Sequence, residues 1–448
     1  MLVAAVTVAA LTLAAGATAH DQNQEYGDSL RLSLDECVRI ALSDNPTVKV
    51  ADMEVKRVDY SRKEVLGQLL PSLNFTGSYT RNLSLQTIYM DAGGGETRAI
   101  KMGRDNQFST GFNATIPLVM PTLWKSLKVS DDQILQNLEA ARANKLSLVH
   151  QVKNAYYAQL LAIDTRRVLN ESYATAKFVA DVYAKQFAMG AASEYDVLRA
   201  NVAVTNLEPS LLEVDNSIRQ LGLQLKMLMG MDVRTPLVLT QSLEDFKARM
   251  YDRTLSTDTA LTRNTSLRTL ELQTESLRHT LEMRKAAWWP TLSGSASLMW
   301  SSMSNGNPLR NFMWTKSSSV GLTLSLPIFQ GGQRYYRQKQ AEISLNEMKW
   351  RRENLERSLQ LQVQSQMDNI VKSLKQVESN AAGVRQAVKA NEIMHESFKI
   401  GAATFIQVLD TENALLDARL AYFQTIYNYL VAENELEFTL GNSHFVNE

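Results

Sequence analysis

Residues 291–300 read TLSGSASLMW, and in this stretch apolar residues alternate with small, mostly polar ones. Leu292 and Leu298 belong to one set of positions, and Ser293 and Ser297 to the other. A period of two is typical of a β-strand whose two faces meet different surroundings. The length of about ten residues also suits a tilted strand that crosses a bilayer. The stretch therefore predicts a strand with one apolar face and one small, polar face.

Three further stretches alternate in the same way. Their apolar positions are Phe75, Gly77 and Tyr79; Phe112, Ala114 and Ile116; and Val320, Leu322, Leu324 and Leu326. We predict four strands, over about 72–82, 107–117, 291–301 and 317–327. Lipid on one side and water on the other explains the two faces. A soluble hairpin with one wet face is the alternative interpretation.

Each strand pair is followed by an unusually long helical segment. From Thr122 to Phe187 there is no proline or glycine, and from Gln333 to Ile400 the only breaker is Gly383. About 66 helical residues span about 100 Å, which indicates a bundle or coiled coil rather than a compact domain. The seam of the second segment steps by three and four through Met367, Ile370, Leu374, Val377, Ala381, Val384 and Val388. We predict long helices over about 122–188 and 333–400.

The long helices are expected to end at Gly190 and Gly401, because glycine is the preferred residue just past a helix C-terminus. The predicted turns at these tips cover 187–193 and 398–404, and helices over about 194–229 and 404–441 lead back. Pro209 should break or kink the first of these returning helices.

An amphipathic helix is predicted before each strand pair. The first begins near Ser33, which has capping-box spacing to Glu36, and runs to about Leu69; the second covers about 258–288.

The chain repeats itself at a nearly fixed offset. Pro71-Ser72-Leu73 returns as Pro290-Thr291-Leu292, Ile116-Pro117-Leu118 as Leu326-Pro327-Ile328, and Phe187-x-x-Gly190 as Phe398-x-x-Gly401. The sequence predicts two similar structural repeats, 20–230 and 257–448, joined by an equatorial linker at 231–256. The largest length difference falls in the loop 82–107, centred on Gly93-Gly94-Gly95, which we expect to face outside the cell.

Composition excludes several classes of protein. The 47 basic and 47 acidic residues balance, which argues against a nucleic-acid binder. The single cysteine, Cys37, excludes intrachain disulfides and a Cys-rich zinc site, and its apolar surroundings predict a buried thiol. The five histidines show no metal-ligand spacing, and no phosphate-binding loop or nucleophile elbow is present. We therefore expect no catalytic residues, no metal and no cofactor.

The first 19 residues are small and apolar and end in Ala17-Thr18-Ala19, which predicts a cleaved signal peptide over 1–19. Beyond them no apolar run reaches the roughly 18 residues of a membrane helix. If the exported protein spans a bilayer, it must do so with strands.

Four strands cannot close a barrel, and an open sheet edge in lipid leaves backbone groups without partners. Three copies of four strands make twelve, an even number within the usual range. The twelve strands would continue into a hollow cylinder of long helices, which is the shape of a conduit.

The duplicated plan resembles the TolC-like outer-membrane efflux proteins over about residues 30–442. The resemblance is carried by strand pairs that end in Ile-Pro-Leu or Leu-Pro-Ile, and by Phe-x-x-Gly turns followed by Asp/Gln-Val-Leu. It implies a mainly α fold with a small β part: a trimeric α-helical barrel continuous with a 12-stranded transmembrane β-barrel, four strands per protomer. It implies a homotrimer in the outer membrane with a long helical part in the periplasm. It also implies a periplasmic adaptor protein and an inner-membrane transporter as partners in drug efflux or type I secretion.

The same resemblance assigns roles to the tip residues. Phe187, Gly190, Phe398 and Gly401 are implied to meet the adaptor. Each glycine also has the simpler role of capping a helix.

Three further residues match gate positions of the family. Asp410 matches one of two acidic entrance positions, Gln407 occupies the other, and Asp196 matches a latch position. A ring of three carboxylates attracts cations, which makes Asp410 a selectivity candidate; an ordinary solvated charge is the alternative. The expected partners of the latch are absent, since Phe398 and Ala403 replace a tyrosine and an arginine.

Three tryptophans stand beside the predicted periplasmic ends of the strands. Trp124, Trp288 and Trp289 are interpreted as membrane-interface anchors, with core packing as the alternative. For the whole chain, the alternative to a duct is a non-pore periplasmic coiled-coil adaptor or scaffold. That reading explains the long helices but not the four strands.

Overall fold

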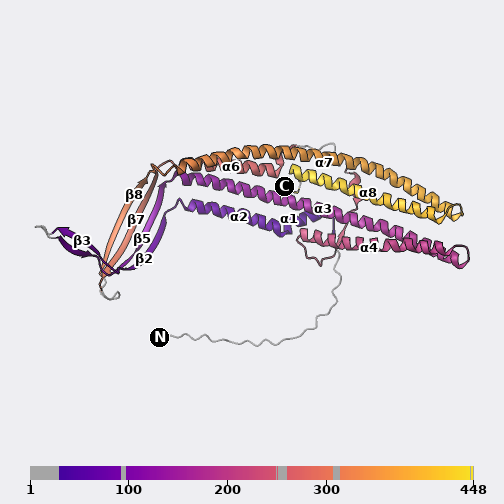
Figure 1. Ribbon diagram of the computed structural model, residues 1–448, viewed down its shortest axis with the longest axis horizontal. Coiled ribbons are helices and arrows are strands. Elements are labelled where there is room, and N and C mark those ends of the chain that lie inside the picture. The colour runs from indigo at the N-terminus through magenta and orange to yellow at the C-terminus, as the bar shows by residue number, and fades with distance from the viewer. Residues whose placement is uncertain are drawn as a thin grey trace, which may run out of the picture.

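The computed structural model describes residues 30–91, 97–248, 250, 260–305, 313–443 and 445–446. The protein is elongated, with a sheet at one end and long helices that run from it to two turns at the other end (Figure 1). The predicted signal peptide lies outside the described residues, as do Gly93-Gly94-Gly95 and the last part of the predicted linker. Within the described residues no helix has the length and apolar character needed to cross a membrane.

The sheet contains the four strands expected from the alternating pattern. They are β2 (Ser72–Arg81), β5 (Asn106–Val119), β7 (Thr291–Ser304) and β8 (Trp314–Ser325). Their order is β2-β5-β7-β8, and every pair is antiparallel. Each half of the chain thus supplies one hairpin, and the β5–β7 pair joins the halves.

A third hairpin was not predicted. The loop 82–107 contains β3 (Gln86–Asp91) paired with β4 (Thr97–Met102). This hairpin projects beyond the far end of the main sheet (Figure 1).

The two long helices are α3 (Pro121–Ala188) and α7 (Gln333–Lys399). At 1.5 Å per residue each spans about 100 Å. The returning helices are α4 (Glu194–Leu228) and α8 (Phe405–Leu440). Of the break or kink expected at Pro209, the break is wrong, because α4 runs through this residue as one helix, and the kink stays a prediction. Packing of α4 along α3 outweighs the backbone hydrogen bond that a proline removes.

The first amphipathic helix is also not the single helix that was predicted. It is divided into α1 (Leu34–Asp44), which starts with the predicted Ser33–Glu36 capping box, and α2 (Pro46–Gly67). Asn45 caps α2 by accepting a hydrogen bond from the Thr47 amide, and Pro46 takes the first helical position. Its counterpart in the second half is a short 3₁₀ turn, η2 (Leu261–Arg263), followed by α6 (Thr265–Ala286), with Asn264 as the cap.

The two capping asparagines mark equivalent joints. Asn45 Nδ2 donates to the Leu228 carbonyl at 2.7 Å, and Asn264 Nδ2 donates to the Thr439 carbonyl at 2.6 Å. The end of α4 therefore meets the start of α2, and the end of α8 meets the start of α6. α2 and α4 pack along α3, whereas α6 and α8 contact both α7 and α3. Two shorter helices placed end to end thus run beside each long helix.

The main core lies around these joints. It includes Cys37, Tyr156, Leu225, Ile426 and Tyr429, all nearly or fully buried. Cys37 is a free thiol, as predicted, and burial raises its pKa to about 12. Beside the core, β1 (Leu30–Leu32) pairs in parallel with β6 (Leu237–Leu239), and η1 (Leu243–Phe246) follows.

Candidate functional site

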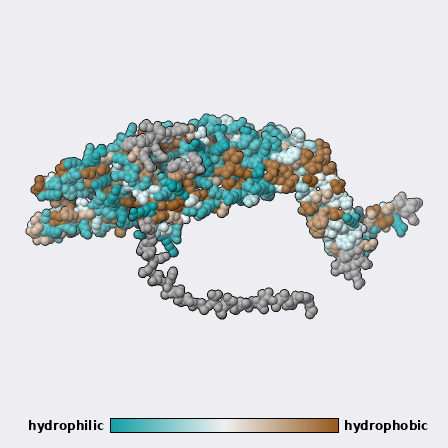
Figure 2. Space-filling model, turned by 180° about the vertical axis from the view of Figure 1, so that it is seen from behind, coloured by the Kyte–Doolittle hydropathy of each residue, from teal (hydrophilic) through white to brown (hydrophobic). Residues whose placement is uncertain are grey.

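The strand register gathers the apolar residues on one face of the sheet. Phe75 pairs with Phe112, which in turn pairs with Leu298, and Ala296 pairs with Val320. The rings of Phe75 and Phe112 lie 5.1 Å apart, and most of the large apolar side chains on β2, β5 and β8 are exposed. Figure 2 shows brown, apolar surface over this end of the molecule. So broad an exposed apolar face marks a surface that meets lipid or protein.

The opposite face of the sheet is polar and made of small residues. Hydroxyls pair across it: Ser78 with Ser109 and Ser297 with Ser319 at 2.7 Å, and Ser301 with Thr315 at 3.0 Å. Small hydroxyl side chains can donate and accept hydrogen bonds among themselves, and they leave room for water. The sheet thus separates an apolar side from a wettable side.

Both edges of this sheet are open in the part of the chain that the structure describes. β2 pairs with β5 alone, and β8 pairs with β7 alone. An exposed edge offers a row of unpaired backbone groups to another strand.

The three tryptophans lie where the sheet meets the helices. Trp124 is in the first turn of α3, and Trp288 and Trp289 precede β7; all three are exposed. The Arg334 guanidinium lies 4.5 Å from the Trp288 ring and donates to the Pro327 carbonyl. This stacking fixes Trp288 at the junction. The anchoring role of the tryptophans stays a prediction.

The two tips are built alike. Gly190 has φ +74° and Gly401 φ +78°, and each donates its amide to the carbonyl of the phenylalanine three residues before it, at 2.9 and 3.0 Å. The next amide closes a second ring onto Gln186 or Ser397, at 2.8 Å. This Schellman geometry requires the left-handed backbone that glycine adopts readily. The sequence therefore places both turns at matched positions.

The residues just before the two glycines are exposed and apolar. Met189 is 74% exposed and Ile400 is 80% exposed. Neither residue was predicted to belong to a site, although both share the offset of 211 with the tip glycines. Together with the exposed Phe187 they give the tips an apolar surface. Phe398 differs from Phe187, because it packs against Tyr183, with ring centroids 5.9 Å apart.

Two of the gate candidates serve as helix caps. The Asp196 carboxylate accepts from the Ser193 hydroxyl at 2.6 Å, and the Gln407 side chain accepts from the Thr404 amide at 2.9 Å. Each completes a capping box at the start of its returning helix. Asp196 also acts on a neighbour: burial, and then the charge of Asp196, raises the pKa of Tyr183 to about 12.

Asp410 lies on an exposed face of α8. The same face carries small and polar residues spaced by three and four: Gln407, Asp410, Ala414, Asp417, Ala421 and Gln424. A spacing of 3.5 residues keeps such a stripe on one side of a helix that belongs to a bundle. The structure leaves this stripe, including Asp410, uncovered within one chain.

The family follows from the chain as a whole. The family model described as outer membrane efflux protein matches residues 37–231 and 257–442. These two segments fall on the two halves of the fold. The chain belongs to the outer membrane efflux protein family.

Curated relatives and solved structures agree. The chain is 24% identical over 390 residues to the outer membrane protein TolC of Salmonella enteritidis, covering 84% of this chain and 75% of TolC. It is 24% identical over 422 residues to the alkaline protease secretion protein AprF of Pseudomonas aeruginosa, covering 92% and 85%. The Campylobacter jejuni CmeC outer membrane channel superposes with a TM-score of 0.74 at 18% identity, covering 91% and 85%. VceC of Vibrio cholerae gives 0.70 at 16%, covering 92% and 96%.

These findings give this family member its location and broad role. It is an outer membrane efflux channel protein, mainly α with a small β part, and its helical part lies in the periplasm. Its relatives are channel proteins rather than enzymes. In the described residues no group of three or more His, Cys, Asp or Glu side chains is arranged to hold a metal ion.

Proposed function

We propose that three copies of this chain form a passive exit duct across the outer membrane. The observation that carries the proposal is the four-stranded sheet, which has one apolar face, one polar face and two open edges. If β8 of one copy pairs with β2 of the next, three sheets close into twelve strands and no edge remains in lipid. The apolar face then meets lipid, and the hydroxyl face lines a watery channel.

The helices extend the duct into the periplasm. At about 100 Å, α3 and α7 project far beyond the membrane-spanning sheet. At their ends the apolar residues Phe187, Met189 and Ile400 form a surface suited to another protein. We propose that a periplasmic adaptor docks at these tips and couples the duct to an inner-membrane pump, as in tripartite efflux or type I secretion.

The gate is proposed to lie at the same end. The uncovered stripe of α8 faces the channel axis in this arrangement, so that three copies of Asp410 form one acidic ring. Such a ring concentrates cations at the entrance. Asp196 and Gln407 would act on the gate indirectly, by fixing where the returning helices begin.

The proposal is tested by the mass of the particle extracted from membranes with detergent, measured by light scattering with the detergent subtracted. A trimer that requires detergent, and that forms channels in planar bilayers, supports the duct. A monomer or dimer that stays in solution without detergent contradicts it, and would favour the alternative of a periplasmic adaptor or scaffold.

A further inference from the structure

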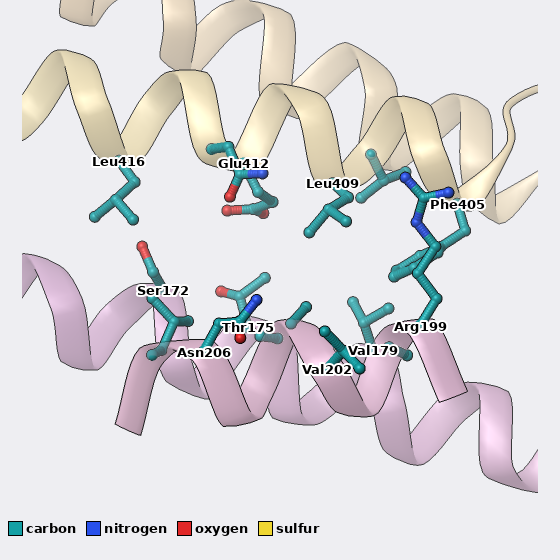
Figure 3. Close-up of a pocket in the computed structure, with 16 residues that line it drawn as sticks. Ser172, Thr175, Val179, Arg199, Val202, Asn206, Phe405, Leu409, Glu412 and Leu416 are labelled. Carbon is teal, nitrogen blue, oxygen red and sulfur yellow. The ribbon is translucent and has the colours of Figure 1, made fainter. Parts of the chain in front are cut away.

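A cleft opens between the two helical hairpins of one chain, between the tip and the main core. It is lined by α3, α4 and α8 and holds about 230 Å³ (Figure 3). Toward the tip it is bounded by the cluster of Val179, Tyr183, Ala200 and Phe405. A second cluster around Leu169 and Val214 lies further along the hairpin. The hairpins thus touch at both ends of a space that their own side chains leave open.

The walls of the cleft are mainly apolar. The large apolar side chains among the lining residues are Val179, Val202, Leu207, Phe405, Leu409 and Leu416. A few polar groups converge on the apolar walls, and Glu412 and Arg199 are the charged ones. Apolar walls with a small number of placed polar groups are typical of a small-molecule site. The volume is below the roughly 300–1,000 Å³ of drug-sized sites, so the ligand should be small.

The Glu412 carboxylate is held in place by side chains of α7. Its Oε1 accepts from His395 Nε2 at 2.5 Å and from Asn391 Nδ2 at 3.1 Å, both on α7. Its side chain is only 17% exposed, and its Oε2 has no hydrogen bond among the described residues. Figure 3 shows the Glu412 side chain directed from α8 toward α3 and α4. A carboxylate fixed at one oxygen and open at the other is prepared to accept from a cationic donor.

Arg199 lies at the tip end of the cleft. Its Nη1 donates to the Tyr195 hydroxyl at 3.0 Å, and in the described part of the chain it has no carboxylate partner. In Figure 3 its guanidinium lies near Phe405, at the tip end of the cleft. Phe405 and Glu412 are seven residues apart, which is about 10 Å along the helix axis.

From this geometry we propose that the cleft binds a small aromatic amine. Its ring system lies on the apolar walls, its protonated amine donates to Glu412 Oε2, and an acceptor at the opposite end receives a hydrogen bond from Arg199. The ligand bridges α8 to α3 and α4. The site goes beyond the proposed duct, because a passive conduit needs no such cleft. It is also separate from the exposed stripe of Asp410, since Glu412 faces inward on α8.

The probe is radiolabelled 5-methoxytryptamine, which has a bicyclic ring, an amine at one end and an acceptor at the other. Binding is measured by equilibrium dialysis against the full chain in amphipol, with protein-free amphipol subtracted. We expect saturable binding that Glu412→Gln weakens at least tenfold, because the amide still accepts from His395 and Asn391 but has lost its charge. Asp417→Asn is the matched control, since it removes a carboxylate from the exposed stripe of the same helix, and should bind like wild type.

A neutral analogue, 5-methoxy-3-methylindole, should bind weakly and be insensitive to Glu412→Gln. Ala176→Leu, which fills the cleft from α3 without touching the Glu412 network, should abolish binding and decides the question if Glu412→Gln fails to fold. The proposal is overturned if no binding exceeds the amphipol blank, if the neutral analogue binds equally well, or if folded Glu412→Gln or Ala176→Leu binds like wild type. Because the cleft lies within one chain, failure here leaves the trimer measurement unaffected.

Discussion

Replacing Asn264 with alanine should loosen the joint between α8 and α6. The side chain is 4% exposed and makes two bonds: Oδ1 accepts from the Leu267 amide at 2.9 Å, and Nδ2 donates to the Thr439 carbonyl at 2.6 Å. Loss of a helix N-cap costs about 1 kcal/mol. A buried carbonyl left without this donor adds about 1–3 kcal/mol. The local free energy of opening should therefore fall by roughly 2–4 kcal/mol.

Amide hydrogen exchange measures this change directly. A factor of ten corresponds to about 1.4 kcal/mol, so exchange in the first turn of α6 should accelerate roughly 30- to 1,000-fold. Asn264→Ser keeps an N-cap acceptor but lacks the amide donor, and should accelerate exchange less than Asn264→Ala. Asn45→Ala should produce the same effect in α2, because Asn45 makes the equivalent pair of bonds. Acceleration below threefold in Asn264→Ala, with the fold intact, would refute the reasoning.

Three further predictions concern the tips, the gate and alkaline pH. Asp410→Asn should reduce the cation preference of the channel, seen as a smaller reversal potential in a salt gradient, whereas Asp181→Asn on α3 should not; equal potentials for wild type and Asp410→Asn would contradict the acidic ring. Gly190→Ala and Gly441→Ala both force a residue with a side chain into φ above +70°, which costs about 1–2 kcal/mol. Gly441→Ala should lower the thermal midpoint further, because its Cβ would lie 2.0 Å from the Arg263 carbonyl while that of Gly190 meets open space, and equal midpoints would count against this. The pKa of Tyr183 is raised to about 12. Its contribution to the stability of the tip is therefore complete below pH 10, the ordinary tyrosine pKa being about 10, and is lost as the pH rises through about 12. In urea titrations, the loss of unfolding free energy between pH 9 and pH 11.5 should be smaller in Tyr183→Phe than in wild type. An equal loss in the two proteins would argue against this role of Tyr183.

The regular elements could be predicted because their patterns are long. Ten residues of strict alternation mark β7, and 68 helical residues in α3 contain no breaker after Pro121. The break expected at Pro209 does not occur, because a local rule about backbone hydrogen bonds ignores the packing of α4 along α3. The division at Asn45-Pro46 was missed although its signal is standard, an asparagine cap followed by proline at the first helical position.

At the tips, the positions of the turns could be predicted from the sequence, but the exposed apolar residues beside them could not. Gly190 and Gly401 stand out because a left-handed cap favours glycine. Met189 and Ile400 do not, because an apolar residue near a helix end is ordinary until its exposure is known. The cleft around Glu412 could not be predicted either, since it depends on how two hairpins, more than 200 residues apart in the chain, lean on each other.

The joints at Asn45 and Asn264 also explain how such a long molecule can arise by tandem duplication. In each half the chain runs from the joint to the sheet, then along the full length of the molecule to the tip, and then back to the same joint. The half encoded by a second gene copy therefore begins and ends at the same position along the long axis of the molecule. A short lateral connection then suffices to link two copies, and neither the strands of the sheet nor the turns at the tips are interrupted.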